Sequence, residues 1–418
     1  MLSTLRDAWK IPELRNKIIF TLIMLFIYRL GTFIPVPYID TEVLQQYISD
    51  GGMLGLFDIM SGGNFSNFTI FAMSITPYIN SSIIMNLLTF AIPSLERLAK
   101  EGEEGRKKIT QYTRYLTILL AIVQALGIAL SFSNILTEKS WMTISIVIIT
   151  ITAGTAFLMW LGEQITESGI GNGISLIIFI SIISRLPSSI VELFKLVQVG
   201  TLHWLSVVLF FIFAIVVIVA VVAVQEGQRK IPVQYSKRVV GRKMYGGQST
   251  HIPLKVNMAG VIPVIFASSI TMFPATLASF FPSSSVANWI NKFFAWGNVF
   301  TTIVYIILII AFTYFYTAIT FNPIEIADNM KKQGGFIPGI RPGKPTSDYF
   351  NKSVTKLTLF GGVFLAAVAV IPIVVGNIMD VNLQFGGTSL LIIVGVALDT
   401  IKQLESQMLM RNYQGFLK

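Results

Sequence analysis

The chain contains 418 residues, 53% of them hydrophobic and only 12% charged, and its mean hydropathy is +0.70. A soluble protein of this length does not bury so much apolar surface, so the composition excludes an ordinary globular domain and predicts that lipid surrounds most of the chain. The sequence has no cysteine and only two histidines, far apart, which excludes disulfides and thiol nucleophiles and leaves no histidine cluster for a metal.

Residues 1–17 are basic and amphipathic and lack the pattern of a cleavable signal peptide, so we expect a cytoplasmic segment that remains attached. Apolar windows of about 20 residues then predict about ten membrane spans, followed by a cytoplasmic tail at 402–418. The predicted spans are 18–36, 68–92, 110–133, 142–162, 174–195, 204–224, 258–280, 300–321, 357–376 and 385–401.

Lysine and arginine indicate the orientation of these spans. Most of the 31 basic residues lie in the two terminal segments and in three loops, 93–114, 226–257 and 322–356. The loops on the other side hold only Lys139, Lys195 and Lys292. By the positive-inside rule both termini are cytoplasmic, and the net charge of +10 needs no nucleic acid to explain it. Five spans in each half would give the halves opposite orientations, an arrangement that commonly surrounds a pathway.

The run GGMLGLFDIMSGG, residues 51–63, is apolar but too short to span a membrane, and a glycine pair flanks it on each side. Glycine pairs allow flexible hinges. The residues alone favour a surface helix on the outer leaflet over a segment that enters the membrane, because non-spanning backbone is tolerated at membrane depth only inside protein or a cavity.

Polar residues are unevenly distributed among the predicted spans. The second (70–90) and the seventh (258–277) each contain a proline followed by several Asn, Ser or Thr residues. Such residues serve either ordinary close packing between helices or an interface weak enough to open sideways, and sequence alone does not decide between them. The ionisable residues Arg29, Arg185, Glu192 and Asp399 fall near span ends, where long side chains can reach the interface. A coupled transporter usually needs such groups at mid-membrane.

Enzyme motifs are weak. The spans show no Ser–His pair or paired aspartates at a shared depth. GIGNGIS (169–175) joins two predicted helices and follows no strand, and PGIRPGKPT (338–346) departs from the phosphate-loop spacing.

Two of the basic loops are longer than orientation requires. Residues 226–257 and 322–356 interleave β-forming residues, aromatics, prolines and cations, which predicts hairpins that protrude into the cytosol. Arg242, Lys243 and Arg341 fall near the expected tips, where they would meet an acidic protein surface or RNA phosphate. The alternative is a solvated loop that serves orientation alone.

Several stretches together resemble the bacterial SecY family, the central subunits of a protein-conducting channel. They occur in the family's order and cover most of the chain, with looser similarity at both ends and around 282–299. They are GEEGRKKITQYTRY (102–115), MWLGEQITESGIGNGIS (159–175), QSTHIPLKVNMAGVIPVIFASSI (248–270), FNPIEIADNMKK (321–332), GFIPGIRPG (335–343) and FGGTSLLI (385–392). Many members have two arginines where this chain has Arg242 and Lys243, so the charge is kept but planar bidentate pairing is lost at the second position.

The resemblance implies an all-α membrane protein of about ten transmembrane helices in two inverted five-helix halves around a central pore. The halves are 18–195 and 196–401, the docking loops 226–257 and 322–356, and the plug, a re-entrant half-helix, about 54–62. The implied plug side chains are Leu54, Leu56, Phe57, Ile59 and Met60.

The resemblance also implies a ring of apolar side chains at the channel waist and a lateral gate between the second and seventh spans. A narrow apolar constriction resists wetting and ions yet deforms around a passing chain. The ring residues matched by motif are Ile75, Ile79, Ile178, Ile265 and Ile392. The candidate polar contacts of the gate are Asn80, Gln124 and Ser268.

The implied function is a channel that translocates unfolded secretory proteins across the bacterial plasma membrane and releases membrane segments laterally into it. Implied partners are SecE-like and SecG-like small subunits, a SecA-like ATPase or a ribosome on the cytosolic loops, signal-sequence-bearing polypeptides and the lipid bilayer. No cofactor and no enzymatic activity are expected. The alternatives are a secondary transporter of a small solute, against which the scarcity of mid-span charge counts, and an insertase or scaffold without a pore.

Overall fold

The computed structural model describes most of the chain. The described residues are 2–41, 58, 61–131, 136, 140–200, 203–235, 238–240, 243–245, 249–279, 285–294, 298–379 and 387–415.

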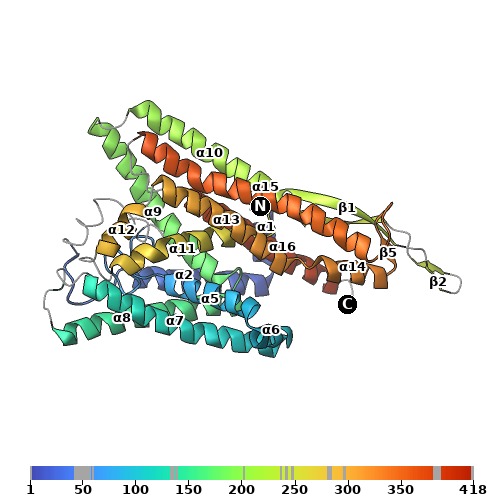
Figure 1. Ribbon diagram of the computed structural model, residues 1–418, viewed down its shortest axis with the longest axis horizontal. Coiled ribbons are helices and arrows are strands. Elements are labelled where there is room, and N and C mark those ends of the chain that lie inside the picture. The colour runs from blue at the N-terminus through green and yellow to red at the C-terminus, as the bar shows by residue number, and fades with distance from the viewer. Residues whose placement is uncertain are drawn as a thin grey trace.

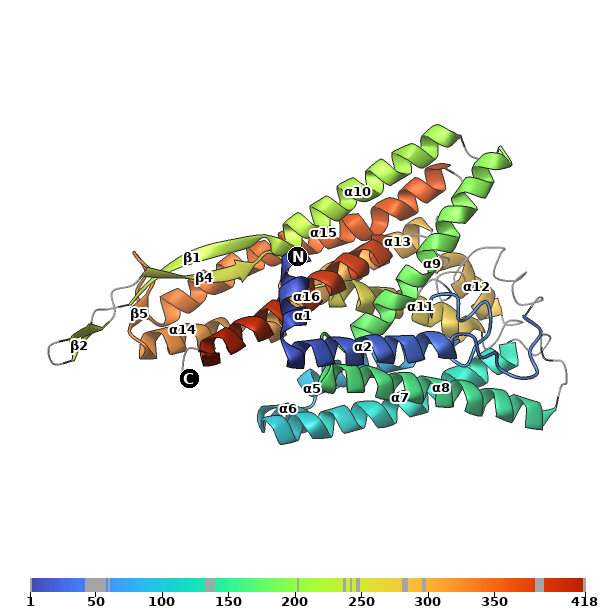
Figure 2. The ribbon, with the colours of Figure 1, turned by 180° about the vertical axis from the view of Figure 1, so that it is seen from behind.

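Helices form nearly all of the regular structure and run roughly along one long axis (Figures 1 and 2). In the first half of the chain they are α1 (Leu2–Lys10), α2 (Pro12–Gly31), α5 (Thr76–Ala91), α6 (Pro93–Lys100), α7 (Glu103–Ser131), α8 (Trp141–Ser168) and α9 (Gly173–Gln198). In the second half they are α10 (Trp204–Glu226), α11 (Ile262–Ser279), α12 (Ser285–Phe293), α13 (Val299–Thr320), α14 (Pro323–Lys332), α15 (Lys344–Met379) and α16 (Gly387–Gly415).

A helix overlaps each of the ten predicted spans, but fewer meet the requirements of length and apolar composition. Within the described residues seven do, namely α7, α8, α9, α10, α13, α15 and α16. An eighth is counted if α5 and α6, bent by 100° at Ile92, form one broken span. α2 carries charged residues near both ends, and α11 is a shorter apolar helix. The fold is therefore that of a multi-span helical membrane protein.

The second span begins later than the sequence pattern predicts. Residues 61–75 form a series of turns, and the α5 helix starts only at Thr76, with Pro77 in its first turn. Phe68 and Ser74 adopt φ angles of 40° and 51°, which break any helix through this stretch. Two of its backbone groups pair with the segment that follows α2, since the Val36 amide donates to the Phe68 carbonyl and the Ile70 amide donates to the Ile34 carbonyl. We call residues 61–75 the connecting turn.

The first long loop forms the predicted hairpin. β1 (Gln228–Tyr235) pairs antiparallel with β4 (Ser249–Lys255), and β2 (Arg238–Val240) pairs with β3 (Lys243–Tyr245) beyond it. The strands extend away from the helices at one end of the molecule in both views (Figures 1 and 2).

The hairpin predicted for 322–356 is wrong. This segment contains α14, a two-residue strand β5 (Gly335–Phe336) that joins the edge of β1, and the first three turns of α15. The physical reason is the helix start at Asn322, whose side chain accepts hydrogen bonds from the Ile324 and Glu325 amides, with Pro323 in the first helical turn.

The hairpin, α14 and the start of α15 share an apolar cluster of their own, which includes Ile231, Leu254, Met330, Ile337 and Phe350. They form a module distinct from the main core. In both views the module lies at the end of the molecule opposite α12.

Close helix packing relies on a few glycines. A Cβ on Gly154 of α8 would collide with the Ile70 carbonyl of the connecting turn, and one on Gly387 of α16 would collide with the Val368 carbonyl of α15. Small residues allow backbones to approach in this way where lipid gives helices no hydrophobic drive to associate.

Candidate functional site: an apolar waist and a polar network beside it

The five isoleucines implied as a ring are all buried, at 1–8% exposure, in one apolar cluster. Ile75 directly precedes α5 and Ile79 lies in its first turn, whereas Ile178, Ile265 and Ile392 lie in α9, α11 and α16. Elements far apart in the sequence thus bring them to a common core. Because this cluster is the main core of the molecule, shared membership does not by itself distinguish a ring from packing. The ring therefore stays a prediction.

A sixth isoleucine extends the set in a way that the sequence analysis missed. Ile182 lies four residues after Ile178 on α9 and is buried in the same cluster, at 2% exposure. The i, i+4 spacing puts the two side chains on one face of the helix, and this spacing was available in the sequence.

The helices implied as the gate are in contact. α5 packs against α11, and α7 contacts both. Asn80 and Gln124 are half-buried and Ser268 is buried, but no hydrogen bond joins these three described side chains to one another. The Ser268 hydroxyl instead donates to the Ile265 carbonyl of its own helix, at 2.8 Å. Their role at a gate stays a prediction.

Beside the α5–α11 interface, α5 makes polar and aromatic contacts with α13. The Asn86 amide donates to the Tyr316 hydroxyl at 3.3 Å, and Phe90 meets Phe315 edge-on with centroids 5.8 Å apart. Asn86 and Phe90 are exposed, so these are surface contacts with little burial to stabilise them.

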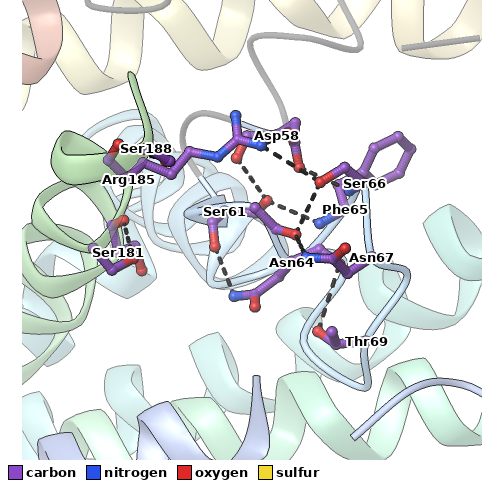
Figure 3. A network of polar contacts seen from close by, with 12 residues as sticks. Asp58, Ser61, Asn64, Phe65, Ser66, Asn67, Thr69, Ser181, Arg185 and Ser188 are labelled. Atoms are coloured by element: carbon purple, nitrogen blue, oxygen red, sulfur yellow. Dashed lines mark hydrogen bonds and ion pairs between the residues drawn. The ribbon is translucent and has the colours of Figure 1, made fainter. Parts of the chain in front are cut away.

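A dense polar network surrounds Asp58, three positions before the connecting turn (Figure 3). Asp58 is 1% exposed, and its carboxylate forms an ion pair with Arg185 of α9. The second carboxylate oxygen accepts the Ser66 amide at 2.7 Å. Arg185, whose side chain is 22% exposed, also donates to the Ser66 hydroxyl at 3.4 Å. Both oxygens of a buried carboxylate are therefore satisfied, as burial of a charge requires.

A second polar chain links the same turn to two helices. The Asn64 amide donates to the Tyr28 hydroxyl of α2 at 3.1 Å, and Tyr28 lies 2.6 Å from the Ser181 hydroxyl of α9. Because Ser181 donates its own proton to the Ile177 carbonyl at 2.7 Å, Tyr28 must be the donor to Ser181. The connecting turn is thus bound to α2 and α9 by directional contacts.

This network was not expected from the sequence. Arg185 was predicted to reach the membrane interface, whereas the structure pairs it with Asp58, a carboxylate 127 positions earlier that was not predicted as a site residue. The available signal was a single acidic residue within the apolar run 51–63, which is costly there unless a cation pairs with it.

The remaining site predictions fall largely on other parts of the chain. The plug side chains Leu54, Leu56, Phe57, Ile59 and Met60 lie outside the described residues, as does Arg242. Lys243 is the first residue of β3. Arg341 is exposed in the turn before α15, where its carbonyl accepts the Thr346 hydroxyl at 2.9 Å. Docking through these three cations stays a prediction.

Residues 69–401 match the family model SecY. The chain is 48% identical over 431 aligned residues to the protein translocase subunit SecY of Bacillus subtilis (strain 168), with 100% of both chains covered. One similar solved structure concerns the plug domain of the SecY protein in the closed translocation channel (TM-score 0.66, 20% identity, 94% of this chain and 92% of that one). Another is Sec61 in the canine ribosome–channel complex from the endoplasmic reticulum (TM-score 0.62, 18% identity, 94% and 92%). At these identities the two structures show the shared fold.

Proposed function

This chain belongs to the SecY family of protein translocase subunits, and we propose that it carries unfolded secretory proteins across the bacterial plasma membrane. It is a protein-conducting channel subunit. The observation that carries this conclusion is the 48% identity to a translocase subunit SecY over the whole of both chains. A secondary transporter of a small solute is not favoured. We expect no enzymatic activity from the chain itself.

We propose that the helices form two inverted halves of five, 18–195 and 196–401, around a pore, with both termini in the cytoplasm. The five isoleucines close the pore at its waist. Their burial in one cluster, from α9, α11, α16 and the start of α5, supports this assignment. An apolar constriction of this kind excludes water and ions by dewetting and widens around a polypeptide.

The lateral gate is proposed to open between α5 on one side and α11 and α13 on the other. Support comes from the small number of polar contacts across this interface and from their exposure. Asn80, Gln124 and Ser268 would contact an entering signal segment and not one another. Separation of these helices would expose an apolar segment to lipid, where its helical backbone is internally satisfied.

The plug, about 54–62, is proposed to close the channel on the outer side of the waist. In a SecY protein whose solved structure is similar to this chain, the plug domain stabilises the closed state of the translocation channel and maintains a membrane seal. The apolar composition of the run and its short length fit such a segment.

The cytosolic module is proposed to bind the driving partner, a SecA-like ATPase or a ribosome, through Arg242, Lys243 and Arg341. SecE-like and SecG-like subunits would brace the halves in the membrane. The exposure of Arg341 and the protruding hairpin support docking, and a ribosome-bound relative is known for the fold. Cations at such tips attract acidic protein or RNA phosphate.

Reconstitution tests the function directly. The purified chain, with small subunits from the same source, is placed in vesicles with a candidate motor and an unfolded secretory substrate. We expect protease-protected substrate that depends on the motor and on ATP. Vesicles that accumulate a small solute against a gradient, but no polypeptide, would instead support the transporter.

A further inference from the structure

We propose that Asp58 and Arg185 form a latch that holds the plug segment on α9 while the channel is closed and that must separate before the channel opens. The inference rests on the proposed function, because a latch has meaning only in a channel that opens. Both residues belong to the part of the chain that the structure describes, Asp58 three positions before the connecting turn and Arg185 on α9.

The contact is built for one geometry. The two carboxylate oxygens of Asp58 have different partners, Arg185 on α9 and the backbone amide of Ser66. Gly62, at φ 72°, lies so close to α9 that a Cβ there would come within 2.6 Å of the Ser181 carbonyl oxygen. A Cβ on Gly63 would come within 3.2 Å of Arg185 Nε. The glycine pair therefore lets the chain lie directly under the guanidinium.

The latch lies on the same helix face as two of the waist residues. Ile178, Ile182 and Arg185 are spaced at i, i+4 and i+7 on α9, which brings them into line along the axis. A movement of α9 that widens the waist would therefore displace the cation from Asp58. In this way the ion pair couples the attachment of Asp58 to α9 to the width of the waist.

The charges make the latch all-or-none. Asp58 is 1% exposed, so its carboxylate is strongly unfavourable in this buried position without Arg185. The chain at Asp58 must then move away from α9 for water to hydrate the carboxylate. Arg185 is partly exposed, so its guanidinium can turn to water when Asp58 is neutralised. Loss of the cation should therefore displace the chain at Asp58 from α9 more than loss of the anion does.

The experiment measures ion conductance of the reconstituted, resting complex for four variants: Asp58→Asn, Arg185→Gln, the double variant and Arg185→Lys. We expect a severalfold rise for Arg185→Gln and a smaller rise for Asp58→Asn. In the double variant we expect less leakage than in Arg185→Gln alone, because no charge is left buried. Arg185→Lys, which keeps the charge, should stay near the parent.

A matched control separates a latch from general destabilisation. Arg114→Gln removes another arginine–carboxylate ion pair between elements, to Glu163 at 2.8 Å between α7 and α8, away from the connecting turn. We expect no change in resting conductance. Thermal unfolding of each variant is recorded alongside, so that a variant that fails to fold is replaced in the comparison by the double variant, which retains hydrogen-bonding groups.

Two outcomes would overturn the latch: folded variants of the pair with parental conductance, or equal leakage from Arg185→Gln and the double variant. Substrate translocation by the parent is measured first in the same vesicles. A parent that does not translocate contradicts the proposed function, whereas a translocating parent with tight variants contradicts only the latch.

Discussion

The apolar cluster around the five isoleucines and the polar network around Asp58 share a face of α9. The first is held together by apolar packing and the second by directional polar contacts. Ile178 and Ile182 meet other apolar side chains, and such contact has no preferred direction. Arg185 instead binds Asp58 and Ser66 directly, and Ser181 is linked to Asn64 of the connecting turn through the Tyr28 hydroxyl, all through contacts with fixed donors and acceptors. An apolar contact can stretch gradually around a passing chain, whereas a buried ion pair is either made or broken. We therefore propose that one helix combines a deformable closure with a switch-like one.

The largest expected effect comes from removing both closures. If the five isoleucines form one constriction, exchanging several for Asn or Ser lets water and small ions into the waist, because polar side chains remove the dewetting barrier. Deletion of about 54–60 alone should give only partial or flickering leakage. The combination should leak more than either change alone, since each barrier compensates for loss of the other. Conductance of the reconstituted complex measures this.

A buried isoleucine outside the waist provides the control. Ile151 is 0% exposed in a separate cluster with Val147 and Ala125, so Ile151→Asn makes the same chemical change elsewhere. We expect lower stability without conductance. Ring variants that remain as tight as the parent even without the plug would identify these isoleucines as packing residues.

A crosslink between α5 and α11 should abolish transport while leaving both closures intact. One cysteine is introduced near Asn80 and one near Ser268. No other thiol can react, because the sequence has no native cysteine. We expect complete loss of secretion in the crosslinked fraction and recovery on reduction. A cysteine pair between α7 and α8, which pack within the first half, is the control and should be harmless. Full transport through a quantitatively crosslinked α5–α11 pair would exclude the gate.

Both closures contain features that run-length and periodicity predicted and features that they did not. The apolar runs predicted the ends of α7 to α10 to within seven residues, because lipid demands long uncharged helices. The predicted start of the second span, at 68, was wrong because Phe68 and Ser74 adopt positive φ angles that end any helix before Thr76. The Asp58–Arg185 pair was missed because its partners are distant in sequence. The hairpin predicted for 322–356 overlooked the Asn322–Pro323 helix start, which was visible in the sequence.

A moderate effect is expected from Arg341→Glu, which leaves both closures unchanged and acts on what drives them. Charge reversal at an exposed turn should repel an acidic partner, so motor- or ribosome-driven translocation falls while insertion and resting conductance stay normal. Lys352→Glu makes the same charge change at another exposed site of the module and should be milder. Normal partner affinity and translocation in Arg341→Glu would refute its docking role.

The smallest expected effect separates the ion pair from the hydrogen bonds beside it. Tyr28→Phe removes the hydroxyl between Asn64 and Ser181 but keeps the ring that stacks on Phe71 with centroids 5.7 Å apart. Asn64 retains the Ser61 carbonyl as an acceptor, at 2.6 Å. Hydrogen bonds between membrane helices contribute about 0.6 kcal/mol each, so we expect a loss of about 1 kcal/mol in unfolding free energy.

Resting conductance of Tyr28→Phe should rise only slightly, because Asp58 and Arg185 still hold the turn on α9. Tyr314→Phe, which removes an exposed hydrogen bond to the Thr355 carbonyl in the second half, gives the background for losing a tyrosine hydroxyl. Leakage from Tyr28→Phe as large as that from Arg185→Gln would mean that the whole network holds the turn in common. In that case the charge pair has no special part in it, and the contrast between a switch-like and a deformable closure would rest on hydrogen bonding in general.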